Sequence, residues 1–176
     1  MTDSSYRRHN STQTLALLDE LTEVYAEIHS GSPEYDYPLY RRDQFISRTK
    51  DQVAREGFEL VTVHADGQLA GFSFGLPFAS GHWWANTTTP SADFLNAAKF
   101  AVIELDVRQK YRGQGWGRAL LDKLLAERHE DFATLAAVRG GTAQAMYERW
   151  GWYSAGAFNG EPVMDVMVLP LKPEDQ

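Results

Sequence analysis

The stretch "KFAVIELDVRQKYRGQGWGRALLDKLL", residues 99 to 125, contains the pattern that decides the fold. Its first nine residues are mainly apolar and predict a strand that ends at Val107. Its last part carries a leucine stripe and predicts a helix. Three glycines at alternate positions, Gly113, Gly115 and Gly117, lie between them and indicate a sharp turn from strand into helix.

The rest of the chain places helices first and then strands that alternate with helices. A strand at residues 134–138 follows the glycine turn and its helix, which makes a crossover unit and predicts that part of the sheet is parallel. Asp66-Gly67 predicts the turn of an antiparallel hairpin. The class is therefore mixed α/β. The other predicted elements are helices at 12–30, 41–55 and 142–150, hairpin strands within 58–78, an irregular connection at 79–94, and closing strands at 152–158 and 163–171.

Length and composition favour one ordinary domain over residues 1–176, with no repeat or linker. The net charge of -7 disfavours nucleic acid and anionic membranes as partners and suits a cationic acceptor. We expect a cytoplasmic protein, because the chain has no long apolar run and no hydrophobic block at its N-terminus. The absence of cysteine and the scattered positions of the five histidines predict no metal site. The chemistry must come from oxygen and nitrogen groups.

The glycine turn has the features of an anion site. Unpaired amides at the start of a helix lie at the positive end of its dipole, and glycines let the backbone approach a ligand closely. Arg112 and Arg118 add positive charge, although they could instead be solvated beside an ordinary tight turn. The dinucleotide motif G-x-G-x-x-G fails because residue 118 is arginine, and the chain has no Gly-Lys-Ser/Thr string of a P-loop.

The turn resembles the signature of the GCN5-related N-acetyltransferases, Q/R-x-x-G-x-G/A, which Arg112, Gly115 and Gly117 fill. The later stretch "AQAMYERWGW", residues 143 to 152, is similar to that family's A-x-x-x-Y-x-x-x-G-aromatic segment. Its matching residues are Ala143, Tyr147, Gly151 and Trp152. Two separated motifs in the correct order make the resemblance far more specific than one.

The resemblance implies a central, mostly antiparallel sheet of six to seven strands, a parallel and splayed central pair, and about four helices. It also implies acetyl-coenzyme A as co-substrate, with its pyrophosphate on the loop amides and the backbone N–H of Val107 or a near neighbour as oxyanion donor. The coenzyme-binding residues implied in this way are Leu105, Asp106, Val107, Arg112, Gly113, Gln114, Gly115, Trp116, Gly117 and Arg118.

The resemblance further suggests an acid and a base for transfer to an amine. A primary amine is protonated at neutral pH, so a base must remove a proton before attack. We expect Glu104 to be this base, directly or through water, with Asp106 as the second candidate. Tyr147 matches the tyrosine that protonates the leaving thiolate, although its helical spacing also suits a core aromatic residue.

The acceptor is an amine of a small molecule or a peptide, and the sequence does not choose between them. Tyr35 and Tyr37, which follow the first predicted helix, and Trp83 and Trp84, which follow the hairpin, would suit an ammonium group by cation-π contact. Alternatively, the tryptophans could cap the core. A homodimer would be compatible with exposed aromatics and closing strands.

Two other functions compete with acetyl transfer. One is an inactive acyl-coenzyme A-binding sensor or partner module. Gly140 is the residue that favours it, because many family members have asparagine there. The other is a serine hydrolase, because "GFSFG", residues 71 to 75, formally matches the nucleophile elbow around Ser73. An elbow requires a helix after the serine, and the residues that follow show no helical period.

Overall fold

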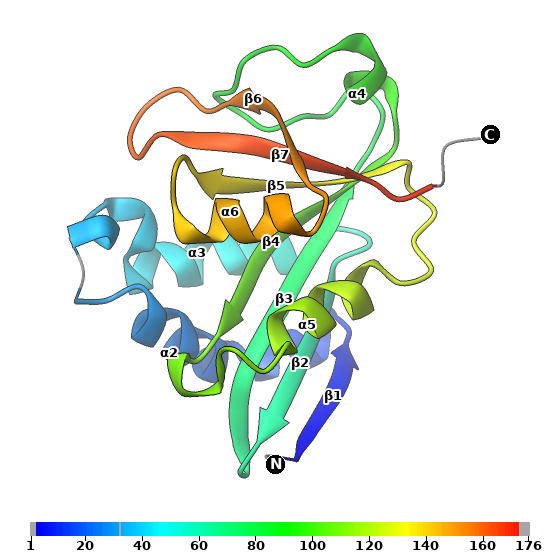
Figure 1. The fold of residues 1–176 in the computed structure, drawn as a ribbon. Coiled ribbons are helices and arrows are strands. Elements are labelled where there is room, and N and C mark those ends of the chain that lie inside the picture. The colour runs from blue at the N-terminus through cyan, green and yellow to red at the C-terminus, as the bar shows by residue number, and fades with distance from the viewer. Residues whose placement is uncertain (1–2, 32, 173–176) are drawn as a thin grey trace. The chain divides into compact units, whose positions relative to one another are not determined.

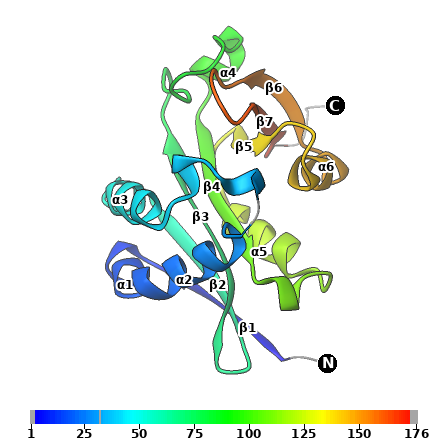
Figure 2. The same cartoon turned by 90° about the vertical axis from the view of Figure 1, so that its left-hand side faces the viewer.

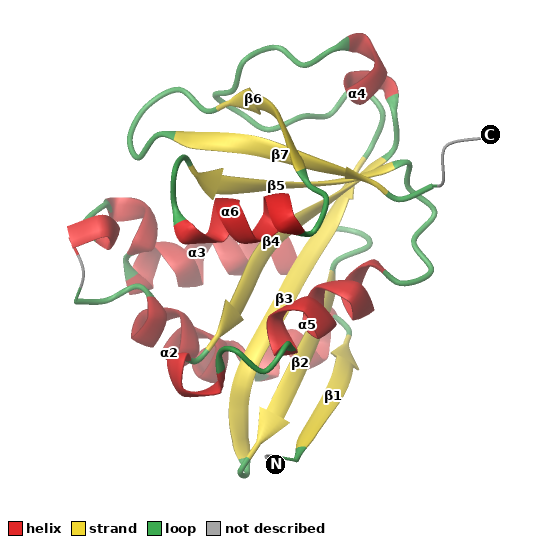
Figure 3. Cartoon of the chain, viewed as in Figure 1, coloured by secondary structure: helices red, strands yellow, loops and turns green. Residues whose placement is uncertain are grey.

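The computed structural model of the protein describes residues 3–31 and 33–172. It contains one seven-stranded sheet in the order β1-β2-β3-β4-β5-β7-β6 (Figures 1 and 3). The pair β4 (Lys99–Val107) and β5 (Phe132–Val138) is parallel, and the other recorded pairs are antiparallel. The predicted mixed α/β class and the parallel pair are therefore confirmed. The parallel register joins Lys99–Ala101 with Phe132–Thr134.

The chain divides into two compact units, each described by itself below. Unit 1 contains the residues up to Leu76 and Glu104–Ala126, and unit 2 contains Pro77–Ile103 and the residues from Glu127 onward. Strands β3 and β4 run from one unit into the other. That residues 1–176 form a single domain stays a prediction. No helix within the described residues is long and apolar enough to span a bilayer.

Unit 1 is a strand layer with helices on both faces. Helices α1, α2 and α3 lie on one face of its strands and α5 lies on the other (Figure 2). Asp66 and Gly67 have φ of 53° and 74°, which is the left-handed turn that the sequence predicts for the hairpin. The elements are β1 (Ser4–His9), α1 (Ser11–Ala16), α2 (Leu18–Ile28), the 3-10 helices η1 (Pro33–Tyr35), η2 (Pro38–Tyr40) and η3 (Gln109–Tyr111), α3 (Arg42–Val53), β2 (Glu59–Ala65), β3 (Gln68–Phe78) and α5 (Trp116–Leu125).

Unit 2 packs its helices on the remaining strands. Helix α6 contacts β5, and its N-terminal end is held by Gln144, whose side chain accepts from the Gly140 N–H at 2.8 Å. Lys99 is fully buried, and its Nζ donates to the carbonyls of Phe94, Leu95 and Ala97, each at 2.9 Å. The Lys99 ammonium therefore caps the carbonyl groups at the C-terminal end of α4. Beyond β4 and β5, the elements are α4 (Ala92–Asn96), α6 (Thr142–Arg149), β6 (Tyr153–Ala157) and β7 (Met164–Pro170).

The structure corrects three details of the predicted elements. Strand β1 was missed because an edge strand pairs through its backbone, and its polar sequence has little need of an apolar face. The helix predicted at 12–30 is two helices that break at Leu17, and Asn10 caps the start of α1 in a capping box with Gln13. The connection at 79–94 contains the start of α4. The described residues thus form six α-helices rather than about four.

Candidate active site

The glycine loop leaves β4 and enters α5 within unit 1, as the sequence predicts. Gly113 and Gly115 have φ of 79° and 82°, and Gly115 is the N-cap of α5. A Cβ built on either residue would meet no atom within 4 Å. These two glycines are therefore required by the backbone conformation, and the space outside the loop is open.

The start of α5 presents amide groups toward this open space. The first backbone bond of the helix runs from the Ala119 N–H to the Gly115 carbonyl at 3.0 Å, so the N–H groups of Trp116 and Gly117 precede it and have no acceptor within the helix. Nearby, Arg112 donates through Nε to the Val107 carbonyl at 3.0 Å. Amides at a helix N-terminus beside an arginine can bind an anion.

Two aromatic side chains fix the loop to the hairpin of unit 1. Tyr111 and Trp116 are buried and stack with centroids 5.1 Å apart. The Tyr111 hydroxyl donates to Asp66 at 2.9 Å and accepts from Gln68 at 3.0 Å. The side chain of Trp116, predicted in the coenzyme site, is therefore a structural anchor, and only its backbone N–H is placed at the helix start.

Two neighbouring carboxyl groups lie on one face of β4. The side chain of Glu104 is 14% exposed, and Asp106 is 5% exposed. The two side chains interact with each other, and each affects the pKa of the other. Burial raises the pKa of Glu104, and the Arg48 guanidinium opposes this change. Burial, followed by the charge of Glu104, raises the pKa of Asp106 well above its ordinary value.

Arg48 of α3 joins this carboxyl pair to α2. Its Nη2 lies 3.5 Å from the Glu104 Oε1 and donates to the Tyr25 hydroxyl at 2.7 Å. Its Nη1 donates to the Leu39 carbonyl at 2.7 Å, and the guanidinium lies over the rings of Tyr25 and Phe45. Burial and the charge of Glu104 raise the pKa of Tyr25, which keeps this phenol neutral. The guanidinium is therefore held in one place next to the acid.

The environment of Ser73 does not support the hydrolase hypothesis. Ser73 is fully buried in β3, and its hydroxyl donates to the Glu104 carbonyl at 2.8 Å. No helix follows it, because the strand continues to Phe78. The first glycine of the apparent motif, Gly71, has another role, because a Cβ on it would lie 2.7 Å from the Asp106 carbonyl oxygen. Gly71 thus allows β3 to approach β4 closely.

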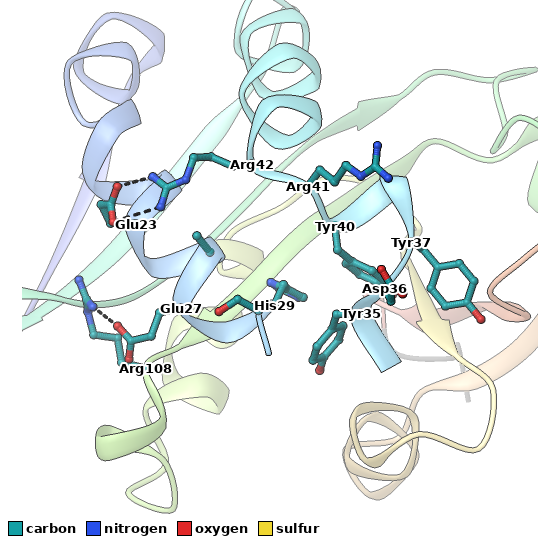
Figure 4. A pocket seen from close by; sticks show the side chains of 12 residues that line it. Glu23, Glu27, His29, Tyr35, Asp36, Tyr37, Tyr40, Arg41, Arg42 and Arg108 are labelled. Atoms are coloured by element: carbon teal, nitrogen blue, oxygen red, sulfur yellow. Dashed lines mark hydrogen bonds and ion pairs between the residues drawn. The ribbon is translucent and has the colours of Figure 1, made fainter. Parts of the chain in front are cut away.

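A pocket of about 550 Å³ opens between the end of α2 and the two 3-10 helices that follow it (Figure 4). Two ion pairs, Glu23 with Arg42 and Glu27 with Arg108, lie along one side. Aromatic side chains line the other side (Figure 4). The described lining residues are Glu23, Ala26, Glu27, His29, Ser30, Tyr35, Asp36, Tyr37, Tyr40, Arg41, Arg42 and Arg108.

His29 lies at the centre of the aromatic wall. Its ring stacks on Tyr25 and Tyr40 with centroids 4.1 and 5.2 Å apart and meets Tyr35 edge-on at 4.8 Å. Its Nδ1 donates to the Tyr25 carbonyl at 2.9 Å. Burial lowers the pKa of His29 to about 4. The imidazole is therefore neutral at physiological pH, and the wall is uncharged and aromatic.

The remaining predicted residues lie in unit 2. Tyr147 is 8% exposed and packs against Trp150 and Trp152, with centroids 5.8 Å away from each. Trp84 donates its indole N–H to Thr134 at 2.9 Å, and Trp83 stacks on Phe94. The predicted Tyr35 and Tyr37 line the pocket, whereas Trp83 and Trp84 do not. Glu104 and Asp106 do not line it either; Tyr25 and Arg48 connect them to its aromatic wall.

Several residues of the site were not predicted from the sequence. His29 and Tyr25 are four residues apart on α2, which is the spacing of stacked neighbours on one helix face. Arg48 follows Phe45 by three residues, so it shares the buried face of α3. A polar residue in register with an apolar stripe was the available signal for Arg48, and it points to a buried charge that needs a partner.

The family comparison assigns the chain to the acyltransferases of the N-acetyltransferase type. The chain belongs to the acetyltransferase (GNAT) family: the model of the acetyltransferase (GNAT) domain matches residues 56–154. This confirms the resemblance that the two motifs indicate. A search of curated protein sequences finds no match.

Solved structures support the same fold over nearly the whole chain. The PaiA N-acetyltransferase of Thermoplasma acidophilum, in complex with coenzyme A, is 15% identical, covers 96% of this chain and 99% of its own, and has a TM-score of 0.61. The ribosomal-protein-S18-alanine N-acetyltransferase of Escherichia coli is 18% identical, covers 99% of this chain and 97% of its own, and has a TM-score of 0.62. An aminoglycoside 6'-acetyltransferase of type Ii is 14% identical, covers 97% of this chain and 99% of its own, and has a TM-score of 0.65.

Proposed function

We propose that the protein transfers the acetyl group of acetyl-coenzyme A to an amine. The observation that carries this proposal is the loop between β4 and α5, where two glycines with positive φ precede a helix start that faces open space. Family membership supports the same donor, and the similar Thermoplasma enzyme was solved with coenzyme A.

The residues of the loop fit a pyrophosphate. The amides of residues 113–118 would hold it, since the missing Cβ atoms of Gly113 and Gly115 leave room for close approach. Arg112 and Arg118 would add charge, while Gln114 and Trp116 would contribute backbone groups only. Residues Leu105 to Val107 would hold the pantetheine arm through their backbone. Bound in this way, the donor supplies a thioester carbonyl that an amine can attack.

The carboxyl pair suits the removal of a proton from the amine. A base works best when its pKa lies near the operating pH, and burial raises the pKa of Glu104 toward that range. Glu104 takes one proton from the ammonium, directly or through water. The nitrogen then attacks the carbonyl carbon, the nitrogen–carbon bond forms, and the carbon–sulfur bond breaks. The nitrogen then releases its second proton to water, and the thiolate leaves with a proton from the acid described next.

Tyr147 is the proposed donor of the proton to the thiolate. Its place in the family motif supports this role, and its ring packs against the rings of Trp150 and Trp152. A phenol is weakly acidic enough to stay protonated at neutral pH and strong enough to protonate a thiolate.

The pocket lined by Tyr35 and Tyr37 is the proposed place of acceptor recognition. Its aromatic wall suits an ammonium group, and Asp36 adds a carboxylate beside the two that are paired with Arg42 and Arg108. The names of the similar enzymes refer to acceptors as different as a ribosomal protein's alanine and an aminoglycoside, so the fold alone does not select one. Both small molecules and peptide N-termini therefore belong in the test.

The deciding experiment measures thiol release from acetyl-coenzyme A with a panel of amines, beside coenzyme binding by calorimetry. We expect amine-dependent release, a loss of about 100-fold or more with Glu104→Gln, and retained coenzyme binding. Tyr147→Phe should slow release where chemistry limits the rate. Binding without release for any amine would instead favour the sensor hypothesis, and Tyr147→Phe at full turnover would remove the acid assignment.

A further inference from the structure

The carboxyl pair on β4 contains one atom whose hydrogen bonding is incomplete. The Oδ2 of Asp106 is buried and, among the described residues, receives no hydrogen bond from a donor group. An ionised carboxylate without donors is costly at this depth, because it has lost its water and gained nothing in return. A neutral carboxylic acid would avoid that cost and would also have a proton to donate.

Glu104 has the opposite surroundings. Its carboxylate faces the Arg48 guanidinium at 3.5 Å, which is within ion-pair distance. Arg48 is in turn held by the Tyr25 hydroxyl and the Leu39 carbonyl, neither of which carries charge. Glu104 is also partly exposed, whereas Asp106 is buried. A negative charge is therefore better stabilised on Glu104.

The described charged and titratable groups around the pair act unequally on its two carboxyl groups. Helix α2 contributes the neutral phenol of Tyr25, and α3 contributes Arg48. Strand β3 contributes only the hydroxyl of Ser73, which is bonded to the Glu104 backbone. Arg112, after β4, acts against a neutral Asp106, because its charge lowers the pKa of that carboxyl, but burial and the charge of Glu104 outweigh it. Two carboxyl groups this close cannot both ionise cheaply, so one proton remains between them.

We propose that the shared proton is bonded to Asp106, which donates it in a hydrogen bond to the Glu104 carboxylate. Arg48 is the positioning residue that keeps the negative charge on Glu104. This inference rests on the proposed function only for its catalytic meaning, since the location of the proton is a property of the free protein. It resolves the choice between the two acids: Glu104 accepts the proton of the amine, and Asp106 orients its carboxylate.

The pair of reciprocal amide variants tests the assignment. In Asp106→Asn, the amide N–H₂ can still donate to Glu104, so the acceptor-dependent turnover should fall by less than about tenfold. In Glu104→Gln, no carboxylate is left beside Arg48, and turnover should fall by about 100-fold or more. The reverse order, with Glu104→Gln the milder variant, would overturn the proposal and make Asp106 the base.

Arg48 variants test the positioning role by a readout that loss of packing alone does not produce. Arg48→Met removes the cation, so the acidic limb of the kcat/KM profile should move to higher pH. In Arg48→Lys the acidic limb should move only part of this way, because lysine keeps the positive charge without the guanidinium geometry. An unshifted acidic limb in a folded Arg48→Met variant would contradict the role given to Arg48.

NMR of selectively labelled aspartate and glutamate carboxyl carbons tests the proton location without activity. The aspartate signal that disappears in Asp106→Asn should have the chemical shift of a protonated acid at neutral pH, and the signal assigned by Glu104→Gln should be that of a carboxylate. An ionised Asp106 would overturn the inference. Absence of acetyl transfer in the unmodified protein would instead contradict the proposed function and leave this measurement decisive.

Discussion

Two buried aspartates on β strands, Asp106 in unit 1 and Asp165 in unit 2, have nearly the same exposure, 5% and 7%. Asp165 accepts from Arg139 at 2.6 and 2.9 Å and from Gln144 at 2.7 Å. These hydrogen bonds, led by that of Arg139, lower the pKa of Asp165. Asp106 has an unfilled oxygen and a raised pKa. Burial and the charge of Glu104 thus dominate the titration of Asp106, whereas hydrogen-bond donors dominate that of Asp165.

The contrast also separates structural from chemical roles. The Asp165 cluster connects Arg139 and the start of α6 to β7, and both carboxylate oxygens of Asp165 accept hydrogen bonds. It also gives the turn at Gly140 its own contacts, because Gln144 accepts the Gly140 N–H. The Asp106 cluster keeps a proton that can move, as expected where stability is given up for chemistry.

The largest expected effect is an opposite pH dependence of stability in two amide variants. The raised pKa of Asp106 means that the folded state keeps a proton that the unfolded state has lost, so this carboxyl destabilises the wild type increasingly as pH rises above about 4. Asp106→Asn should therefore gain stability relative to wild type with rising pH, by up to about 1.4 kcal/mol per pH unit within the window between the two pKa values.

Asp165→Asn is the matched control for that measurement. The lowered pKa of Asp165 gives stability that is full above the unfolded pKa of about 3.9 and is lost as pH falls through the folded pKa. The deficit of Asp165→Asn should therefore be full at neutral pH and shrink in acid. Urea unfolding of wild type and both variants from acid to neutral pH measures both slopes. Slopes of the same sign would end the distinction between the two aspartates.

The second expected effect concerns the backbone that carries Asp106. Gly71→Ala would bring a Cβ to 2.7 Å from the Asp106 carbonyl oxygen, and backbone atoms cannot move away cheaply. We expect a loss of about 1–3 kcal/mol in the free energy of unfolding. Gly117→Ala is the control, because its Cβ would lie 3.8 Å from the Val107 side chain, an ordinary contact inside a helix. Equal losses in the two variants would contradict a specific contact at Gly71.

Much of this arrangement could be predicted from the sequence, and the missing part has a physical cause. The hairpin turn, the parallel strand pair and the start of α5 follow local rules of period and backbone conformation, so their sequence signals were sufficient. Glu104 and Asp106 were identified as neighbours on one strand. Arg48 was not, because its partner lies far away in the chain, and a long-range ion pair leaves no local pattern.

The third expected effect is the loss of the neutral donor of the Asp165 cluster. Gln144→Leu removes the hydrogen bond to the Asp165 Oδ2 and leaves that buried oxygen with no donor from this side, as in Asp106. We expect a loss of about 1–2 kcal/mol and an upward shift of the pKa of Asp165, measured by urea unfolding and by NMR titration. The control is Glu148→Gln on the exposed face of the same helix. A loss no larger than in this control would mean that donors do not set the titration of Asp165.

The smallest expected effect is that of Arg139→Gln. The Arg139 side chain is 54% exposed, so water can replace much of its bond to Asp165, and salt screens the remaining attraction. We therefore expect a smaller loss of stability than in Gln144→Leu, and one that decreases further in high salt, whereas the Gln144→Leu loss should persist. Urea unfolding at low and high ionic strength separates the two. A larger, salt-independent loss in Arg139→Gln would contradict this expectation. It would show that the charge of Arg139, rather than the neutral donor Gln144, keeps Asp165 ionised. The difference between Asp165 and Asp106 would then come from the positions of their arginine partners, Arg139 and Arg48.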